Sequence, residues 1–170
     1  MTNYRRSRIA GVSYFFTVNL ADRSQSLLTD HIALLRSAFE YTRERHPFVV
    51  DAIVVLPEHI HTILTLPEGD SDFALRWRLI KTVFSRGLPH GESRSDSRQS
   101  KGERGIWQRR YWEHLIRDEA DFHGMSITSI LIRSSTAWCR VWPIGNIRHF
   151  IVTCKRGFCR WIGRVIRMLY

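Results

Sequence analysis

The order in which strand-like and helix-like patterns follow one another is the sequence feature that most constrains the fold. Large apolar residues occupy every second position between residues 12 and 20, which predicts a half-buried strand. From Asp30 onward apolar residues recur every three or four positions, and this pattern stops before Pro47. We therefore expect an amphipathic helix, with Thr29 or Asp30 at its N-terminal cap.

A second pair of strands follows this helix. Residues 48–56 form a nearly continuous apolar run, and residues 60–66 alternate between apolar and polar types. Pro57 and Glu58 separate the two runs, so we expect a hairpin with its turn at this point.

The next segment predicts a second helix, a loop and a last strand. Residues 73–84 have helical periodicity, with Leu75, Leu79, Ile80, Val83 and Phe84 expected inward and Arg76, Arg78 and Lys81 on or beside the opposite face. Residues 87–105 contain almost no apolar side chains, as in a mobile basic loop, and residues 111–116 predict a strand.

The order strand, helix, two strands, helix, strand is that of an α+β fold, a ferredoxin-like antiparallel sheet with two helices on one face. A chain of 170 residues favours one compact domain. Its three cysteines form no zinc-type or disulfide pattern, which favours a reduced cytoplasmic protein. The apolar run near the N-terminus is too short and too polar for a membrane span.

The charge balance predicts an anionic partner. Lys and Arg number 26 against 16 Asp and Glu, and the pI is about 10.4, so the chain should attract nucleic acid. A solvated surface that only keeps the protein soluble is the alternative that charge alone leaves open.

His59 and His61 stand two residues apart on a predicted strand. Their imidazoles therefore project from the same face and could grip one divalent ion, while Ile60 points into the core. The spacing alone is equally compatible with two ordinary polar residues.

Three segments together resemble the REP-associated tyrosine transposases, which are single-tyrosine HUH transposases of bacteria. They read "FFTVNL", "DAIVVLPEHIHTILTLPEGDSDFALRWRLIK" and "KGERGIWQRRYWEHLIRDEADF". The resemblance runs from about Tyr4 to Phe122. It implies the HUH endonuclease fold and a bacterial, cytoplasmic protein that is a monomer or a homodimer.

The resemblance also implies a chemistry and a substrate. In that family the two histidines, here His59 and His61, hold Mg²⁺ or Mn²⁺, and a tyrosine on a following helix attacks a phosphate of single-stranded DNA. The substrates are imperfect palindromes that fold into hairpins. Candidate DNA-contacting residues supply cations and aromatic faces, namely Arg76, Trp77, Arg78, Lys81, Arg109, Arg110 and Trp112.

The chain departs from the family after Phe122. Members of the family have a helix here that resembles "HVDYIHxNPVKHGLV". It contains the nucleophilic tyrosine and, four residues later, an asparagine that is the third metal ligand. This chain reads "HGMSITSILIRSSTAWCRVW", and its last tyrosine is the final residue, Tyr170. Tyr170 and Tyr111 are therefore only weak substitutes for the nucleophile.

A neighbouring reading frame accounts for the departure. Codons for Met125 to Ile130 can be chosen so that the shifted frame spells Val-Asp-Tyr-Ile-His. The tyrosine codon then straddles Ile127 and Thr128, and the asparagine codon straddles Leu131 and Ile132. Loss of one base near His123 and Gly124 would produce this tail, whereas a separately evolved tail with its own aromatic core is the alternative.

We therefore expect two parts, an HUH transposase-like domain over residues 1–122 and a frameshifted tail over residues 123–170, with the catalytic helix missing or altered. The predicted function is binding of hairpin DNA by a protein whose ancestral strand cleavage and rejoining has been lost. A purely DNA-binding module and an unstable pseudogene product are the alternatives.

Overall fold

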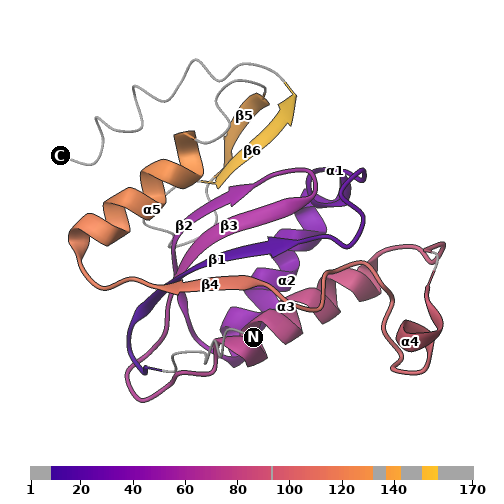
Figure 1. Cartoon of the computed structure of the whole chain (residues 1–170), viewed down its shortest axis with the longest axis horizontal. Coiled ribbons are helices and arrows are strands. Elements are labelled where there is room, and N and C mark those ends of the chain that lie inside the picture. Colours follow the sequence, from indigo (N-terminus) through magenta and orange to yellow (C-terminus); the bar gives the residue numbers. More distant parts are fainter. Residues whose placement is uncertain (1–8, 93, 132–136, 143–150, 157–170) are drawn as a thin grey trace, which may run out of the picture.

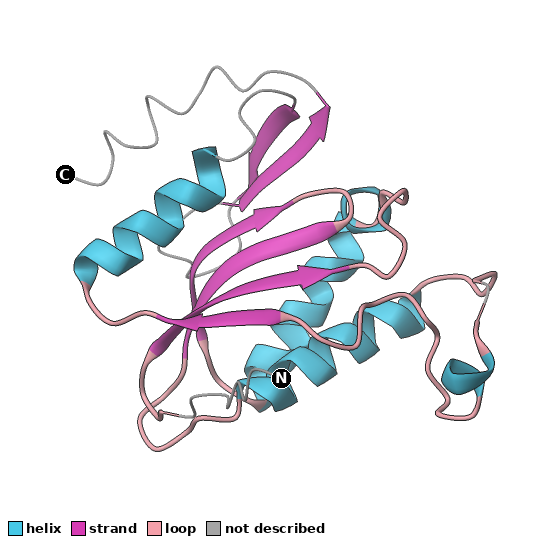
Figure 2. Cartoon of the chain, in the orientation of Figure 1, coloured by secondary structure: helices cyan, strands magenta, loops and turns pink. Residues whose placement is uncertain are grey.

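The computed structural model of the protein describes residues 9–92, 94–131, 137–142 and 151–156. A four-stranded antiparallel unit lies at its centre, in the order β4-β1-β3-β2. Two helices cover one side of this unit, as Figures 1 and 2 show. The elements are β1 (Ser13–Asn19), α2 (Ile32–Arg45), β2 (Val49–Val55), β3 (His59–Thr65), α3 (Phe73–Gly87) and β4 (Trp112–Leu115). The expected ferredoxin-like fold is confirmed.

The first helical segment is divided, which differs from the expected cap. A one-turn helix α1 (Leu27–Asp30) precedes α2, and His31 separates the two with φ −112° and ψ 39°. Thr29 lies inside α1, where its hydroxyl donates to the Ser26 carbonyl. The prediction that Thr29 or Asp30 caps the long helix is therefore wrong, because the chain turns once before that helix begins.

The main core lies between the sheet and the helices α2 and α3. Alternation along β1 directs Tyr14, Phe16 and Val18 toward the helices, and these side chains are almost fully buried. Trp77 from α3 packs edge-on against Phe16. Apolar residues of β1, β2, β3, α2 and α3 thus form one cluster, as the two sequence periodicities predict.

The opposite face of the sheet also contains buried apolar residues. Phe15, Val54 and Ile63 are at most 7% exposed, although they point away from the main core. Helix α5 (Glu119–Leu131) lies on this side and contacts β2 (Figure 1). The sheet therefore has a second, partly covered face, which carries the two histidines.

Two further strands extend the sheet beyond the expected four. They are β5 (Ala137–Trp142) and β6 (Ile151–Arg156), which pair with each other, and β6 runs parallel to β2. Both belong to the segment after Phe122 that departs from the expected family pattern. Within the described ranges, no helix is long and apolar enough to cross a membrane.

The segment expected to be a mobile basic loop contains specific structure. Helix α3 extends into it as far as Gly87, and a one-turn helix α4 (Asp96–Gln99) follows. Arg104 anchors the segment by donating to the Leu88 carbonyl and to the Glu92 carboxylate, at 2.8 and 2.7 Å. The Arg104 guanidinium lowers the pKa of Glu92 to about 2. A basic composition alone therefore did not predict this internal ion pair.

Candidate metal site and nucleic-acid interface

The two histidines of the His-x-His pattern occupy the start of β3 and share one face of the sheet. Their Nε2 atoms lie 3.1 Å apart, with the rings nearly perpendicular. His59 is 4% exposed and His61 is half-buried, while Ile60 between them is fully buried in the main core. The predicted placement of all three side chains is confirmed.

Each imidazole is held in place by a contact at its Nδ1 atom. Glu58 Oε1 lies 3.0 Å from Nδ1 of His59, and Thr17 Oγ1 lies 3.0 Å from Nδ1 of His61. A contact at Nδ1 fixes the orientation of a histidine ring and makes Nε2 the nitrogen that would coordinate a metal ion. Two Nε2 atoms 3.1 Å apart also fit neighbouring positions around one ion, given metal–nitrogen bonds of about 2.1 Å.

The histidine pair supplies two ligands, whereas a divalent ion is coordinated by more than two. Among the residues whose side chains are described, no group of three or more His, Cys, Asp or Glu is placed to hold an ion. The asparagine that the resemblance implies as third ligand is absent from its expected position, where the chain has Leu131 and Ile132. The described donors therefore fit an ion only in part.

Helix α5 is tied to the same face of the sheet at its first turn. His114 of β4 contacts the Asp121 carboxylate at 2.9 Å, and the Asp118 side chain accepts a hydrogen bond from the Asp121 amide. The contact with His114 lowers the pKa of Asp121. Positions 127, 128 and 131 lie on this helix, so its backbone occupies the place where the family pattern requires a helix.

Two of the residues expected to contact DNA are instead buried. Arg76 is 1% exposed and donates to the Pro47 carbonyl at 2.8 Å and to the Asp70 carboxylate at 2.7 Å. Trp77 is fully buried in the main core. The prediction that Arg76 lies on an exposed cationic face is wrong, because its buried guanidinium joins α3 to the connection between α2 and β2.

Two further candidates are partly engaged within the protein. Lys81 donates to the Gln108 carbonyl at 3.0 Å and lies over the rings of Trp107 and Tyr111. Arg109 pairs with Glu103 at 2.8 Å and is 44% exposed. Each cation therefore has an internal partner, which a bound phosphate would have to share or displace.

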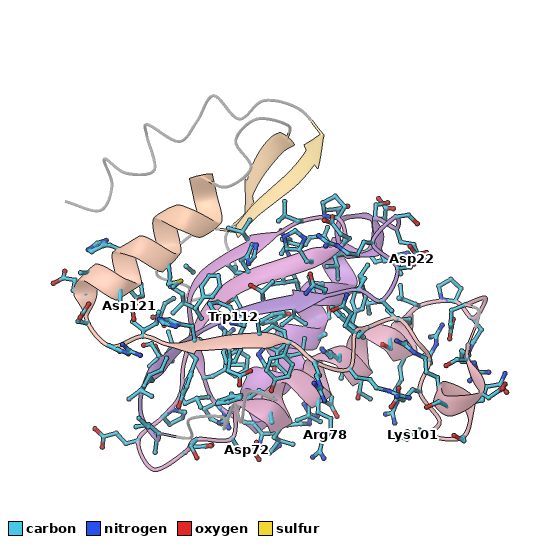
Figure 3. The ribbon with its side chains drawn as sticks, viewed as in Figure 1. Asp22, Asp72, Arg78, Lys101, Trp112 and Asp121 are labelled. Atoms are coloured by element: carbon cyan, nitrogen blue, oxygen red, sulfur yellow. The ribbon has the colours of Figure 1, made fainter. Side chains whose placement is uncertain are left out.

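Three candidates remain open to solvent, on two sides of the sheet. Arg78 is exposed on α3, Arg110 is exposed just before β4, and Trp112 on β4 is 51% exposed. Figure 3 shows Trp112 at β4 and Arg78 on the helical side. Strand β4 is the edge of the sheet, so a ligand that contacts all three would cross this edge.

The substitute nucleophiles have little support. Tyr111 is half-buried, and its ring packs against Phe16, Phe73 and Trp77 in the main core. It therefore lies on the helical side of the sheet, away from the histidine pair. Tyr170 lies outside the described residues.

Sequence reasoning missed the residues that surround the candidate site. Thr17 and Phe15 belong to the same face as His61, because β1 pairs with β3 in a register that puts Thr17 opposite His61. Phe15 stacks on the His61 ring at 5.6 Å. Only Glu58 carried a local signal, as the neighbour of His59, since strand register is not evident from one strand alone.

Comparison with known proteins identifies close relatives. The chain is 51% identical over 123 residues to a Haemophilus influenzae protein assigned to the REP-associated tyrosine transposases, covering 71% of this chain and 69% of the relative. It is 45% identical over 122 residues to the REP-associated tyrosine transposase of Escherichia coli, covering 72% of this chain and 66% of that protein. No protein-family model matches the chain.

The fold has a solved counterpart as well. A structure of a REP-associated tyrosine transposase bound to a REP hairpin superposes with a TM-score of 0.61 and 44% sequence identity. The superposition covers 74% of this chain and 68% of the other. Each of these matches leaves between a quarter and three tenths of this chain uncovered.

Proposed function

This chain belongs to the REP-associated tyrosine transposases, and we propose that it binds hairpins of palindromic repeats in single-stranded DNA without cleaving them. The observation that supports binding is the structural match to a relative bound to such a hairpin. The two proteins share the fold, at 44% identity over 74% of this chain.

The proposed DNA surface is smaller than the sequence indicates. Arg78, Arg110 and Trp112 are exposed, while Lys81 and Arg109 extend the set through partly engaged cations. Guanidinium and ammonium groups neutralise phosphates, and an exposed indole offers a face on which a base stacks. Arg76 and Trp77 serve the fold and are left out of this surface.

His59 and His61 are the residues that would hold Mg²⁺ or Mn²⁺. A bound ion would supply positive charge that neutralises the oxygens of a phosphate. Glu58 and Thr17 orient the imidazoles, and the Phe15 ring stacks on that of His61. We expect weaker binding than in relatives with a third ligand, because two imidazoles leave the remaining positions to water.

The proposed loss of cleavage rests on the residues of α5. The family pattern places a tyrosine at the position where this chain has Ile127 and Thr128, and neither side chain can form a phosphotyrosine. We therefore propose that residues 1–122 are the DNA-binding domain and that residues 123–170 are read out of frame. The matched segments are 123 and 122 residues long, which supports a family-like part of about this length.

One experiment tests binding and cleavage together. The purified chain is incubated with Mn²⁺ and a labelled single-stranded hairpin repeat, and both a native gel and a denaturing gel are read. We expect a shifted band on the native gel and no covalent adduct on the denaturing gel. An adduct would disprove the loss of cleavage, and the absence of any shift would disprove hairpin binding.

A frame-restored variant is the matched control. One base is inserted near the codons of His123 and Gly124, so that the tyrosine and asparagine codons are read in frame. This variant should form the adduct under the same conditions. If the shifted frame of the gene contains stop codons, or lacks those two codons, the frameshift itself is disproved.

A further inference from the structure

A row of aromatic rings crosses the second face of the sheet, from the edge strand to the histidine pair. Trp112 contacts Phe15 with ring centroids 5.7 Å apart, and Phe15 stacks on His61 at 5.6 Å. His61 in turn meets His59 at 4.7 Å. The rings therefore form a continuous row that begins at an exposed side chain and ends at the candidate metal ligands.

Strand register explains why these residues meet. Trp112 of β4 lies opposite Thr17 of β1, and Thr17 lies opposite His61 of β3. Residues opposite one another in neighbouring strands project from the same face. Three strands that are distant in sequence thus contribute to one surface.

Trp112 is unusual for its exposure. It is 51% exposed, although most tryptophans bury the greater part of their surface. Its ring is nearly parallel to that of His114, with 13° between the planes and 5.8 Å between the centroids. His114 contacts the Asp121 carboxylate, so the half-exposed indole lies beside a neighbour that is itself held in place.

We infer that Trp112 is a stacking platform for an unpaired base of the single-stranded DNA that adjoins the hairpin. That base would lie at the edge of the sheet, at the end of the aromatic row that leads to the histidine pair. This inference deepens the proposed function and rests on it. An exposed indole binds bases of any sequence through its π-face, and Arg110, exposed two residues earlier, supplies charge for the neighbouring phosphate. Single-stranded DNA presents a base and a phosphate together, which matches this pairing of side chains.

The test compares two substrates and three proteins. The substrates are a hairpin with an unpaired flank and the same hairpin with abasic sites in that flank. The proteins are the wild type, Trp112→Ala and Tyr41→Ala, which removes an aromatic residue that is 40% exposed on α2. Affinities are measured by fluorescence anisotropy of labelled DNA.

We expect Trp112→Ala to bind the intact flank about tenfold more weakly, since stacking contributes about 1–3 kcal/mol per base. The abasic flank should weaken the wild type to a similar degree and should leave Trp112→Ala unaffected, because both changes remove the same contact. Tyr41→Ala should behave as the wild type. The inference would be overturned if Trp112→Ala lost the same affinity relative to the wild type on both substrates, or if it lost none.

Two further measurements separate the inference from other outcomes. If the wild type binds no hairpin, the proposed function fails and the inference fails with it. If the wild type binds the hairpin and Trp112→Ala binds it equally well, the inference alone fails. Trp112→Phe, which keeps an aromatic face, should recover most of the affinity. If sedimentation shows that Trp112→Ala instead separates a dimer of this chain, the exposed indole is a protein contact and the inference is wrong.

Discussion

At the scale of single residues, two neighbouring arginines of α3 have opposite roles. Arg76 is buried and bonded to Asp70 and to the Pro47 carbonyl, whereas Arg78 is exposed. A helix with cations at both positions does not reveal this difference, because burial depends on what packs against each side. Substituting each arginine in turn distinguishes a guanidinium that stabilises the fold from one that is available to contact DNA.

Arg76→Ala should lower the free energy of unfolding by about 1–3 kcal/mol, because it removes the hydrogen bonds of a buried guanidinium to the Pro47 carbonyl and to the partly exposed Asp70 carboxylate. Arg78→Ala should leave stability unchanged and weaken binding of hairpin DNA. Urea unfolding and anisotropy titrations measure the two effects. Weak binding by folded Arg76→Ala together with unchanged binding by Arg78→Ala would contradict this assignment.

The residues behind the histidines make a second prediction at this scale. Glu58→Gln should weaken Mn²⁺ binding about tenfold, because the carboxylate that orients His59 also makes its imidazole more basic. Glu68→Gln, at an exposed position just beyond β3, is the matched control. Calorimetric titration of Mn²⁺ in the absence of DNA measures the effect. Equal affinities of the two variants would show that Glu58 does not act on the site.

At the scale of elements, the long segment between α3 and β4 depends on one ion pair. Arg104 contacts Glu92 at 2.7 Å and donates to the carbonyls of Ser85, Leu88 and Pro89 around the end of α3. These contacts hold a polar segment against the protein without a large apolar core of its own. Its order should therefore depend on the charge of Glu92.

The pKa of Glu92 is about 2 in the folded protein, below its usual value of 4.5. A lowered pKa stabilises the folded state above pH 4.5, and this contribution is lost as the pH falls toward 2. Glu92→Gln should thus lower the melting temperature at pH 7, and this effect should shrink steadily as the pH falls from 4.5 toward 2. Thermal melts across this range measure the difference. A difference that stays constant with pH would contradict the role of this pair.

At the scale of the whole molecule, the net charge is unevenly distributed. All 16 acidic residues precede residue 123, together with 18 of the 26 basic ones. The remaining eight basic residues lie in the proposed out-of-frame tail, which contains no acidic residue. Most of the net charge of +10 therefore belongs to a segment that need not have been selected for DNA binding.

Changing these eight residues to Gln should reduce non-specific binding more than specific binding. Contacts between dispersed cations and phosphates are independent of sequence and weaken steeply as salt rises. Affinities for a repeat hairpin and for a scrambled hairpin, each measured over a range of salt concentrations, give the two effects. A parallel loss on both hairpins would mean that the tail contributes to specific recognition.

A measurement of stability distinguishes the proposed binding protein from the remaining alternative, an unstable pseudogene product. An unstable product of a damaged gene should give little soluble protein and a broad thermal transition, whereas a folded binding protein should melt in one sharp, cooperative transition. The continuous main core formed by the sheet, α2 and α3 favours the cooperative melt.

The sequence by itself determined the order of the elements and the family. Periodicity of two and of three to four residues reflects which side chains a strand or helix can bury, so the central elements β1, α2, β2, β3, α3 and β4 were predictable. The alternation in β3 likewise placed His59 and His61 on one face, because that placement is local. The departure after Phe122 could be recognised only from sequence, since a backbone does not record the reading frame.

Tertiary structure alone decided which neighbours those side chains have. The register of β1 against β3 and β4 brings Thr17, Phe15 and Trp112 to His61. Arg76 of α3 is buried and bonded to the Pro47 carbonyl between α2 and β2, and Arg104 pairs with Glu92 across the segment that follows α3. These contacts join segments distant along the chain, and local patterns contain no information on which distant partner satisfies a given charge or ring.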